Sequence, residues 1–376
     1  MAVRGLIYLL RSYIGNTASV RDGLRDASEI AGYKGSSWLA DRLGSRADHL
    51  AEEFIEEANS EGIERFERGD YQGAAEKFRE VIFEDYTNYQ GLRGLGASYD
   101  RMGDYEQAAY YYTSATVSDP EDPDIWLYLG SVQLALSRVD EGIESLKIGS
   151  ELAPENLIIA KALARGMLQV DPEETLNLVE SLIGVHGEDA ELLVLRGYAH
   201  EDFGDSEALR RDIEAALAAE PMNAEAHHMA SVAIPALSPE RMLEHARIAN
   251  EGFRAQGNLP GEAEALGNMA WAHYLAGEYP TAEKLSLQAL EMDEQLTNVR
   301  FNLGLVRVAS GDVDGARIAY EDALRHATLS DLREHGLEDL KDLISSQSEN
   351  QGAREILAEL EAREQRFVTD LRSETR

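Results

Sequence analysis

Histidine is the residue type in this chain best suited to acid–base or zinc chemistry, because an imidazole titrates near neutral pH. The nine histidines are scattered along the sequence: His49, His186, His200, His227, His228, His245, His273, His326 and His335. No two have the spacing of a zinc-binding helix, and none accompanies a serine in a hydrolase motif. Since catalysis needs clustered and positioned groups, we predict neither a catalytic nor a metal site.

Other reactive patterns are equally weak. The chain has no cysteine, which excludes disulfides, thiolate metal sites and cysteine nucleophiles. The acidic turn at 119–124 lacks the length and central glycine of a calcium loop, so we interpret it as a solvated turn. Gly91, Gly94 and Gly96 fall within an expected helix and indicate close packing rather than a phosphate loop. We therefore predict no cofactor.

The net charge of −35 is unevenly distributed. Residues 1–50 carry seven Lys/Arg against five Asp/Glu, so the rest of the chain carries 28 against 65. Such an acidic body repels phosphates, which argues against nucleic-acid binding. Only six of the 35 basic residues are Lys. Two interpretations of this composition stay open, a halophilic protein and an acidic mesophilic one.

A turn signature that recurs along the sequence indicates the helices that would position any functional residue. Gly69-Asp70 and Gly103-Asp104 are 34 residues apart, as are Gly277 and Gly311. In residues 89–122, apolar residues mark one face of a first helix, small residues allow close approach of a second, and a proline ends it: Leu92, Leu95, Gly96, Tyr99, Tyr105, Ala108, Tyr112, Ala115 and Pro120.

This pattern resembles the tetratricopeptide repeat (TPR), a pair of helices that recurs every 34 residues. The resemblance implies an all-α, right-handed solenoid in residues 51–330, with about eight units at 55–88, 89–122, 123–156, 157–189, 190–223, 224–262, 263–296 and 297–330. We expect a helical amino-terminal extension at 1–50 and a capping pair of helices at 331–376.

Several boundaries are expected from local signals. A short helix through Leu43 is followed by a new helix whose amino terminus lies at residues 44–48. The sixth unit is irregular, because Ile234-Pro235 ends its first helix early. Residues 256–261 form a long linker. Two polar helices, at about 331–346 and 351–372, close the solenoid.

In the TPR family the first helix of each unit lines a concave groove that holds a peptide. Carried over to this sequence, the resemblance gives the following partner-contacting residues: Asn59, Arg93, Arg101, Tyr128, Lys161, Arg165, Gln169, Asn268, Trp271, Phe301 and Asn302.

Lys161 and Arg165 share a helical face within the acidic body and could bind a carboxylate. Family members that clamp a terminal carboxylate need further polar residues in the next two units. Leu195, Glu225 and Met229 stand there instead. The clamp is therefore incomplete, and a neutralised surface pair is the alternative.

The resemblance implies a non-enzymatic, cytoplasmic scaffold or adaptor that holds a peptide or helix of a partner protein. One alternative is a ligand-sensing regulator in which residues 1–50 are the effector module. Another is an enzyme with a site near His227, His228 and His245.

The first residues have two interpretations of their own. The short apolar run in residues 1–14 is too short for a signal peptide or a membrane span. It either docks on the solenoid as a cap or binds a partner or, weakly, a membrane surface.

Overall fold

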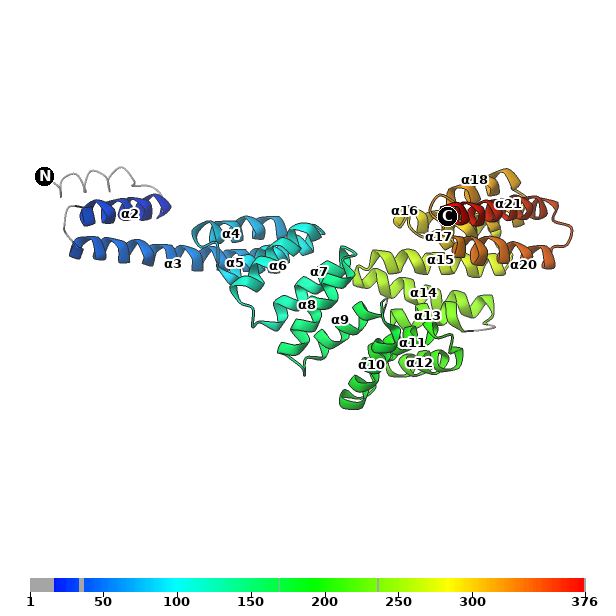
Figure 1. Cartoon of the computed structure of the whole chain (residues 1–376), viewed down its shortest axis with the longest axis horizontal. Coiled ribbons are helices and arrows are strands. Elements are labelled where there is room, and N and C mark those ends of the chain that lie inside the picture. Colours follow the sequence, from blue (N-terminus) through cyan, green and yellow to red (C-terminus); the bar gives the residue numbers. More distant parts are fainter. Residues whose placement is uncertain (1–16, 34–36, 169, 235–236, 375–376) are drawn as a thin grey trace. The chain divides into compact units, whose positions relative to one another are not determined.

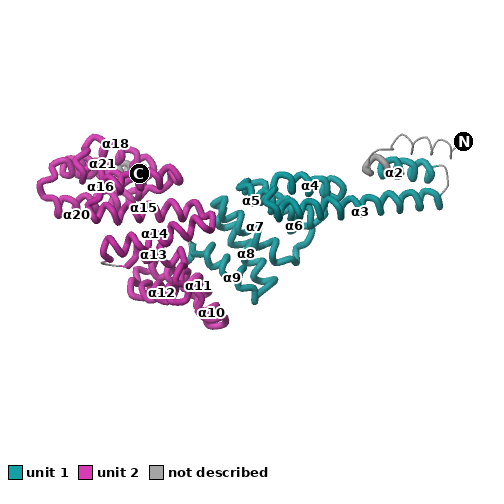
Figure 2. The backbone as a smooth tube through the Cα atoms, turned by 180° about the vertical axis from the view of Figure 1, so that it is seen from behind, with its two compact units in different colours: residues 1–171 teal, residues 172–376 magenta. Residues whose placement is uncertain are grey.

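The computed structural model describes residues 17–33, 37–168, 170–234 and 237–374 (Figure 1), and every regular element among them is a helix. The expected all-α fold is confirmed. The chain divides into two compact units, Met1–Asp171 and Pro172–Arg376 (Figure 2). Residues 1–14 and Gln169, for which a role was predicted from the sequence, lie outside the described residues.

Unit 1 begins with a helical hairpin and continues with stacked helix pairs. Its helices are α2 (Thr17–Tyr33), α3 (Ser37–Glu67), α4 (Tyr71–Glu84), α5 (Tyr89–Arg101), α6 (Tyr105–Ser118), α7 (Pro123–Ala135), α8 (Val139–Leu152) and α9 (Leu157–Met167).

Unit 2 continues the helix pairs and ends in a helical cap. Its helices are α10 (Pro172–His186), α11 (Ala190–Asp202), α12 (Ser206–Ala219), α13 (Ala224–Ala233), α14 (Pro239–Gln256), α15 (Leu259–Leu275), α16 (Tyr279–Met292), α17 (Thr297–Ser310), α18 (Val313–Ala323), α19 (Leu329–Asp331), the π-helix η1 (Leu332–Glu338), α20 (Asp339–Ser346) and α21 (Gln351–Glu374).

The Gly-Asp turns join the two helices of a pair. Gly103 has a φ of +77°, a left-handed conformation that favours glycine. The side chain of Asp104 then accepts a hydrogen bond of 3.2 Å from the backbone N–H of Gln107 and caps α6. The same arrangement begins three further helices: Gly69-Asp70 before α4, Gly204-Asp205 before α12 and Gly311-Asp312 before α18.

Glycines also set how closely the helices of a pair approach. The ring of Tyr112 on α6 lies directly over Gly96 on α5, where an added Cβ would be 2.5 Å from ring carbons. Tyr320 on α18 lies over Gly304 on α17 in the same way, with a closest distance of 2.8 Å. Both tyrosines are almost completely buried. The glycine of each pair is therefore required by the ring that covers it.

The amino-terminal extension is built around α3, a single helix of 31 residues. The expected helix break at residues 44–48 is wrong. Gly44 lies inside α3, where an added Cβ would be 3.4 Å from Ser28 Oγ of α2. A glycine inside a helix costs only about 1 kcal/mol, and here its lack of a side chain lets α2 pack closely. The predicted boundary between residues 50 and 51 therefore falls within one continuous helix.

A buried ion pair fastens α2 to the first repeat. Arg21 Nη1 lies 2.5 Å from Glu84 Oε2 at the end of α4, and both side chains are at most 5% exposed. Removing Arg21 would leave the buried Glu84 carboxylate uncompensated, which is costly, whereas removing Glu84 would leave Arg21 with Asp22 at 3.3 Å. The α2–α3 hairpin is thus attached to the repeat that follows it.

In the irregular sixth unit, the helix boundary predicted near residue 234 is present, but the linker predicted at residues 256–261 is not. Helix α13 ends at Ala233, and α14 begins at Pro239 after its cap Ser238. The long linker expected at residues 256–261 is wrong, because Gly257 and Asn258 alone separate α14 from α15. Gly257 adopts a left-handed φ of +69° and Asn258 caps the next helix, so a tight turn suffices.

The carboxy-terminal cap covers the last repeat. The expected helix at 331–346 is present with a π-helical first half, η1, and the second expected helix is α21. One buried cluster joins α17 and α18 to the cap; it contains Phe301, Leu305, Val308, Tyr320, Leu332, Leu337, Leu340, Leu343, Ile356 and Leu360. The apolar end of the stack is therefore closed by the chain's own helices.

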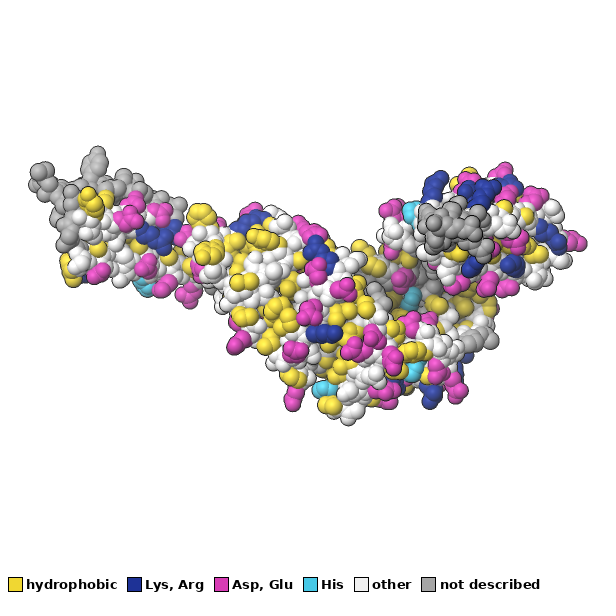
Figure 3. Space-filling model, in the orientation of Figure 1, with side chains coloured by type: hydrophobic (Ala, Val, Ile, Leu, Met, Phe, Trp, Pro, Cys, Tyr) yellow, Lys and Arg dark blue, Asp and Glu magenta, His cyan; other side chains and the backbone are white. Residues whose placement is uncertain are grey.

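Acidic side chains outnumber basic ones in the chain by 70 to 35. Figure 3 shows Asp and Glu in magenta spread over this face of both units, with smaller groups of Lys and Arg in dark blue. None of the helices described is both long and apolar enough to span a lipid bilayer.

Candidate binding pocket in unit 1

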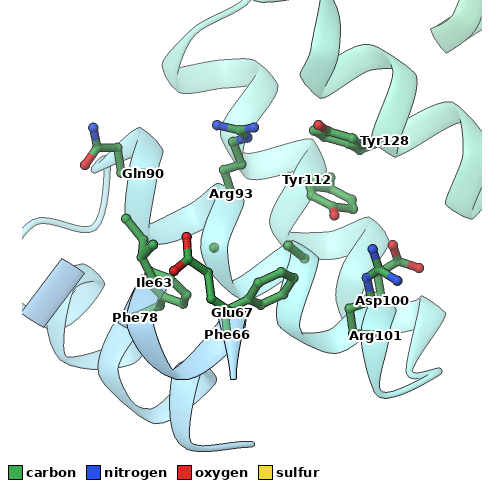
Figure 4. A pocket seen from close by; sticks show the side chains of 12 residues that line it. Ile63, Phe66, Glu67, Phe78, Gln90, Arg93, Asp100, Arg101, Tyr112 and Tyr128 are labelled. Atoms are coloured by element: carbon green, nitrogen blue, oxygen red, sulfur yellow. The ribbon is translucent and has the colours of Figure 1, made fainter. Parts of the chain in front are cut away.

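A pocket of about 500 Å³ opens on unit 1, on one side of α5. Figure 4 shows aromatic and aliphatic side chains around it, with charged groups at its edge. Its residues come from five successive helices: Ile63, Phe66 and Glu67 of α3, Phe78 of α4, Gln90, Arg93, Gly94, Ala97, Asp100 and Arg101 of α5, Tyr112 of α6 and Tyr128 of α7.

The pocket exists because α5 presents small residues on this side. An added Cβ at Gly94 would be 2.6 Å from the ring of Phe78, and one at Gly62 would be 2.8 Å from it. The Phe78 ring therefore occupies the space that two glycine side chains leave free, and it is 3% exposed. Ala97, one turn beyond Gly94 on α5, keeps the space above the ring open.

Two stacked tyrosines form one wall. The ring centroids of Tyr112 and Tyr128 are 5.7 Å apart, with an angle of 27° between the rings. The guanidinium carbon of Arg93 lies 5.6 Å from the Tyr128 centroid, a cation–π geometry. Burial raises the pKa of Tyr112, so its hydroxyl stays protonated at neutral pH. The wall therefore combines a flat apolar surface with a fixed cation.

Charged side chains of both signs line the pocket. Arg93 and Arg101 form no salt bridge with any described residue, whereas Arg138 lies 2.7 Å from Glu106 and Arg196 lies 2.6 Å from Asp212. Burial raises the pKa of Asp100, while the adjacent Arg101 opposes that shift. The pocket is thus lined by two guanidinium groups that form no salt bridge and by two carboxyl groups, those of Glu67 and Asp100.

Three of the predicted contact residues meet here, namely Arg93, Arg101 and Tyr128. Asn59 lies on α3, one turn before Ile63, but is only 6% exposed, and its Oδ1 has no hydrogen-bond partner among the described residues.

The other cationic pair lies elsewhere in unit 1. Lys161 and Arg165 are on α9, outside the pocket lining, and both interact with other groups. The structure therefore does not join this pair to the pocket.

In unit 2 the predicted residues have different surroundings. Asn268 on α15 donates a hydrogen bond of 3.1 Å to Ser231 Oγ and lies 3.3 Å from His228 Nδ1, both on α13. Trp271 stacks on Tyr274 with centroids 5.0 Å apart. Asn302 lies half-buried on α17.

Phe301 is not a partner-contacting residue. It is 0% exposed and belongs to the buried cluster under the carboxy-terminal cap. Its assignment to the groove is wrong, because η1 and α20 cover the face of α17 on which it lies.

The sequence reasoning missed the apolar floor of the pocket, which is formed by Ile63, Phe66 and Phe78. A signal was present in the residues of α5. Gly94 and Ala97 are small and lie three residues apart on one side of the helix, whereas most repeats place bulkier residues there. Small residues opposite aromatic ones indicate a hollow.

The family and fold are supported by comparison with known proteins. A model of the tetratricopeptide repeat family matches residues 93–155 and 268–331. A chain of the APC/C hetero-tetramer Cut9–Hcn1 has a similar structure, with a TM-score of 0.52, 14% sequence identity and coverage of 91% of this chain and 59% of that one. The chain thus contains tetratricopeptide repeats, at residues 93–155 and 268–331.

Further relatives extend this fold assignment. A monomeric mutant of IFIT1 crystallised with Gppp-AAAA aligns with a TM-score of 0.51 at 15% identity, covering 95% of the TPR protein described here and 93% of IFIT1. The Protein CTR9 homolog of Arabidopsis thaliana is 23% identical over 285 residues, and BBSome complex member BBS4 of Bos taurus is 24% identical over 193 residues.

These two curated relatives are much longer proteins. The matches cover 68% and 50% of this TPR protein, but only 26% of the CTR9 homolog and 37% of BBS4. The likeness therefore concerns the repeat architecture, which is consistent with a protein–protein interaction scaffold.

Proposed function

We propose that this TPR protein is a non-enzymatic, cytoplasmic scaffold that binds a segment of a partner protein, with the pocket around α5 as an anchoring site. The observation that supports this proposal is the combination of an open aromatic hollow with two arginines that lack ion pairs. Such a hollow accepts an apolar side chain, and the arginines attract a carboxylate beside it.

The size of the pocket limits its contribution to the free energy of binding. Burying one large aliphatic or aromatic side chain contributes about 1.5–3 kcal/mol, which is far short of a micromolar affinity of about 8 kcal/mol. A bound segment therefore needs contacts beyond this pocket. Lys161 and Arg165 in unit 1, and Asn268, Trp271 and Asn302 in unit 2, remain the proposed positions for additional contacts.

The proposed partner segment has an apolar anchor with acidic residues next to it. An aromatic or leucine side chain would lie between Phe78 and the Tyr112–Tyr128 wall. A neighbouring carboxylate would then be within reach of Arg93 or Arg101 at the edge. Glu67 and Asp100 line the same pocket, so the proposed preference for an acidic neighbour rests on the two arginines forming no salt bridge with them.

The test is binding of a peptide panel to the purified full chain, measured by fluorescence anisotropy. The panel varies one anchor position (Leu, Phe, Tyr, Ala) and its neighbours (Asp, Ala, Lys). The variant Ala97→Trp fills the pocket, and Thr113→Trp on the exposed side of α6 is the matched control. We expect Ala97→Trp to weaken anchor-dependent binding at least tenfold and Thr113→Trp to leave it unchanged.

Charge is tested separately with Arg93→Glu against Arg25→Glu, an equal change at an exposed residue of α2. Loss of acidic-peptide binding in the first variant alone supports the proposed site. Equal binding by both pocket variants and their controls would place partner binding elsewhere on the protein.

A further inference from the structure

Two histidines of the irregular sixth repeat face each other in unit 2. His227 on α13 and His245 on α14 bring their Nδ1 atoms to 2.8 Å, while their ring centroids are 4.9 Å apart. The nitrogens are thus much closer than the ring centres, so they point toward one another and share a hydrogen bond. His227 is only 6% exposed.

A third contact determines where the hydrogens lie. His227 Nε2 is 3.0 Å from the carbonyl oxygen of Pro221, in the turn between α12 and α13. A carbonyl only accepts, so His227 Nε2 carries the hydrogen and its Nδ1 is bare in the neutral ring. The hydrogen of the shared bond therefore belongs to His245 Nδ1.

This arrangement limits how many protons the pair can hold. When both rings are neutral, the pair has two nitrogen-bound protons. A third proton leaves the shared hydrogen bond intact, because one of the facing nitrogens still has no hydrogen. A fourth proton places an N–H on both facing nitrogens, which removes the acceptor and sets two imidazolium charges against each other.

The surroundings of the pair do not relieve that conflict. Burial, His227 of α13 and Arg241 of α14 all lower the pKa of His245, and only Glu244 of α14 opposes them. The adjacent His228 faces α15 instead, with Glu264 Oε2 at 3.6 Å and Asn268 beyond it. Burial lowers the pKa of His228 to about 4, so it does not titrate with the pair.

We propose that His227 and His245 form a pH-dependent tie between α13 and α14, intact with two or three ring hydrogens and broken with four. The unfolded chain binds both additional protons below the ordinary histidine pKa of about 6.5. The tie therefore stabilises unit 2 at neutral pH, and this contribution is lost as the pH falls.

Breaking the tie has a consequence for the neighbouring helix. The same α13 carries Ser231 and His228, which hold the side chain of Asn268 on α15. Because His227, His228 and Ser231 lie on the same helix, any shift of α13 that follows loss of the tie would also reach the hydrogen bonds of Asn268 on α15.

The first test is nuclear magnetic resonance of the full chain labelled with ¹⁵N-histidine at pH 7.5. We expect His227 as the Nε2–H tautomer and His245 as the Nδ1–H tautomer, assigned by the signal missing from each single variant. Two rings of the same tautomer, titrating independently with ordinary midpoints, would overturn the proposal.

The second test compares thermal unfolding of the wild type and His245→Asn at pH 7.5 and 5.0. Asparagine retains an N–H at the position of Nδ1 but does not titrate. We expect the unfolding temperature of the wild type to fall by at least twice as much as that of the variant on acidification. His186→Asn, at an exposed residue of α10, is the control and should follow the wild type. Equal pH dependence in all three proteins would contradict the tie.

Discussion

The repeats at 89–122 and 297–330 have the same internal packing and opposite accessibility. Each has a tyrosine ring over a glycine, Tyr112 over Gly96 and Tyr320 over Gly304. In repeat 89–122 the face of α5 opens into a pocket, whereas in repeat 297–330 the face of α17 lies under the cap.

Equivalent positions account for the difference. The fifth, ninth and twelfth residues of repeat 89–122 are Arg93, Ala97 and Asp100, and those of repeat 297–330 are Phe301, Leu305 and Val308. Covering the small and charged side chains with a helix would bury charges at a cost in free energy, whereas the apolar side chains would be left exposed to water without a covering helix. The same helix pair therefore allows either an open or a covered face, and the residues at these three positions decide which one forms.

The largest expected effect comes from exchanging the fifth residues. Phe301→Arg puts a charge into the closed cluster and should destabilise unit 2 by about 4–5 kcal/mol. Arg93→Phe changes an exposed residue, and we expect a change within about 0.5 kcal/mol. Chemical denaturation measures both. Similar losses from the two substitutions would show that the faces do not differ as described.

The second effect concerns the glycines. Gly304→Ala should cost about 3 kcal/mol, because Tyr320 is enclosed and cannot move away from the new methyl group. Gly96→Ala should cost about 1 kcal/mol, because Tyr112 borders the open pocket and can shift into it. Unfolding curves of the two variants provide the comparison, and a larger loss for Gly96→Ala would refute the argument.

A third effect depends on pH and concerns Asp339, in the cap that covers the last repeat. Burial, followed by the nearby Asp342 and Glu338, raises the pKa of Asp339 on α20 to about 7. The folded state therefore binds more protons than the unfolded state between about pH 4 and 7, so stability falls as the pH rises through that range. Asp339→Asn should remove this slope and stabilise the protein at pH 8 by about 1–2 kcal/mol. Thermal unfolding at pH 5 and 8 checks the sign, with Asp314→Asn on the exposed start of α18 as the control.

The smallest effect concerns the two tyrosine hydroxyls. That of Tyr320 is buried and has no hydrogen-bond partner among the described residues. Its removal in Tyr320→Phe should stabilise the protein by about 1 kcal/mol. Tyr112→Phe, beside the open pocket, should leave stability within about 0.5 kcal/mol of the wild type. Destabilisation by Tyr320→Phe in denaturation experiments would reveal a hydrogen bond at that hydroxyl.

The repeat architecture could be predicted from sequence because its signals are local. A glycine in a left-handed turn, followed by an aspartate that caps the next helix, requires only neighbouring residues. The two-residue turn at Gly257-Asn258 shows the limit, since a run of polar, glycine and proline residues reads as a linker until the cap geometry is known.

The candidate site could be predicted only in part, because its shape depends on contacts between repeats. Arg93, Arg101 and Tyr128 follow from repeat position, but the hollow depends on Phe78 lying against Gly62 and Gly94. Phe301 occupies the same repeat position as Arg93, and no local pattern announces that η1 and α20 cover it. The π-helical turn of η1 likewise has no signal in the residue periodicity.

The unbroken course of α3 gives the protein a lever. At about 1.5 Å per residue, its 31 residues extend about 46 Å. One end packs against α2 at Gly44, and the other supplies Ile63, Phe66 and Glu67 to the pocket. A pull or twist on the α2–α3 hairpin therefore reaches the pocket wall through a single rod, with no joint in between to absorb it.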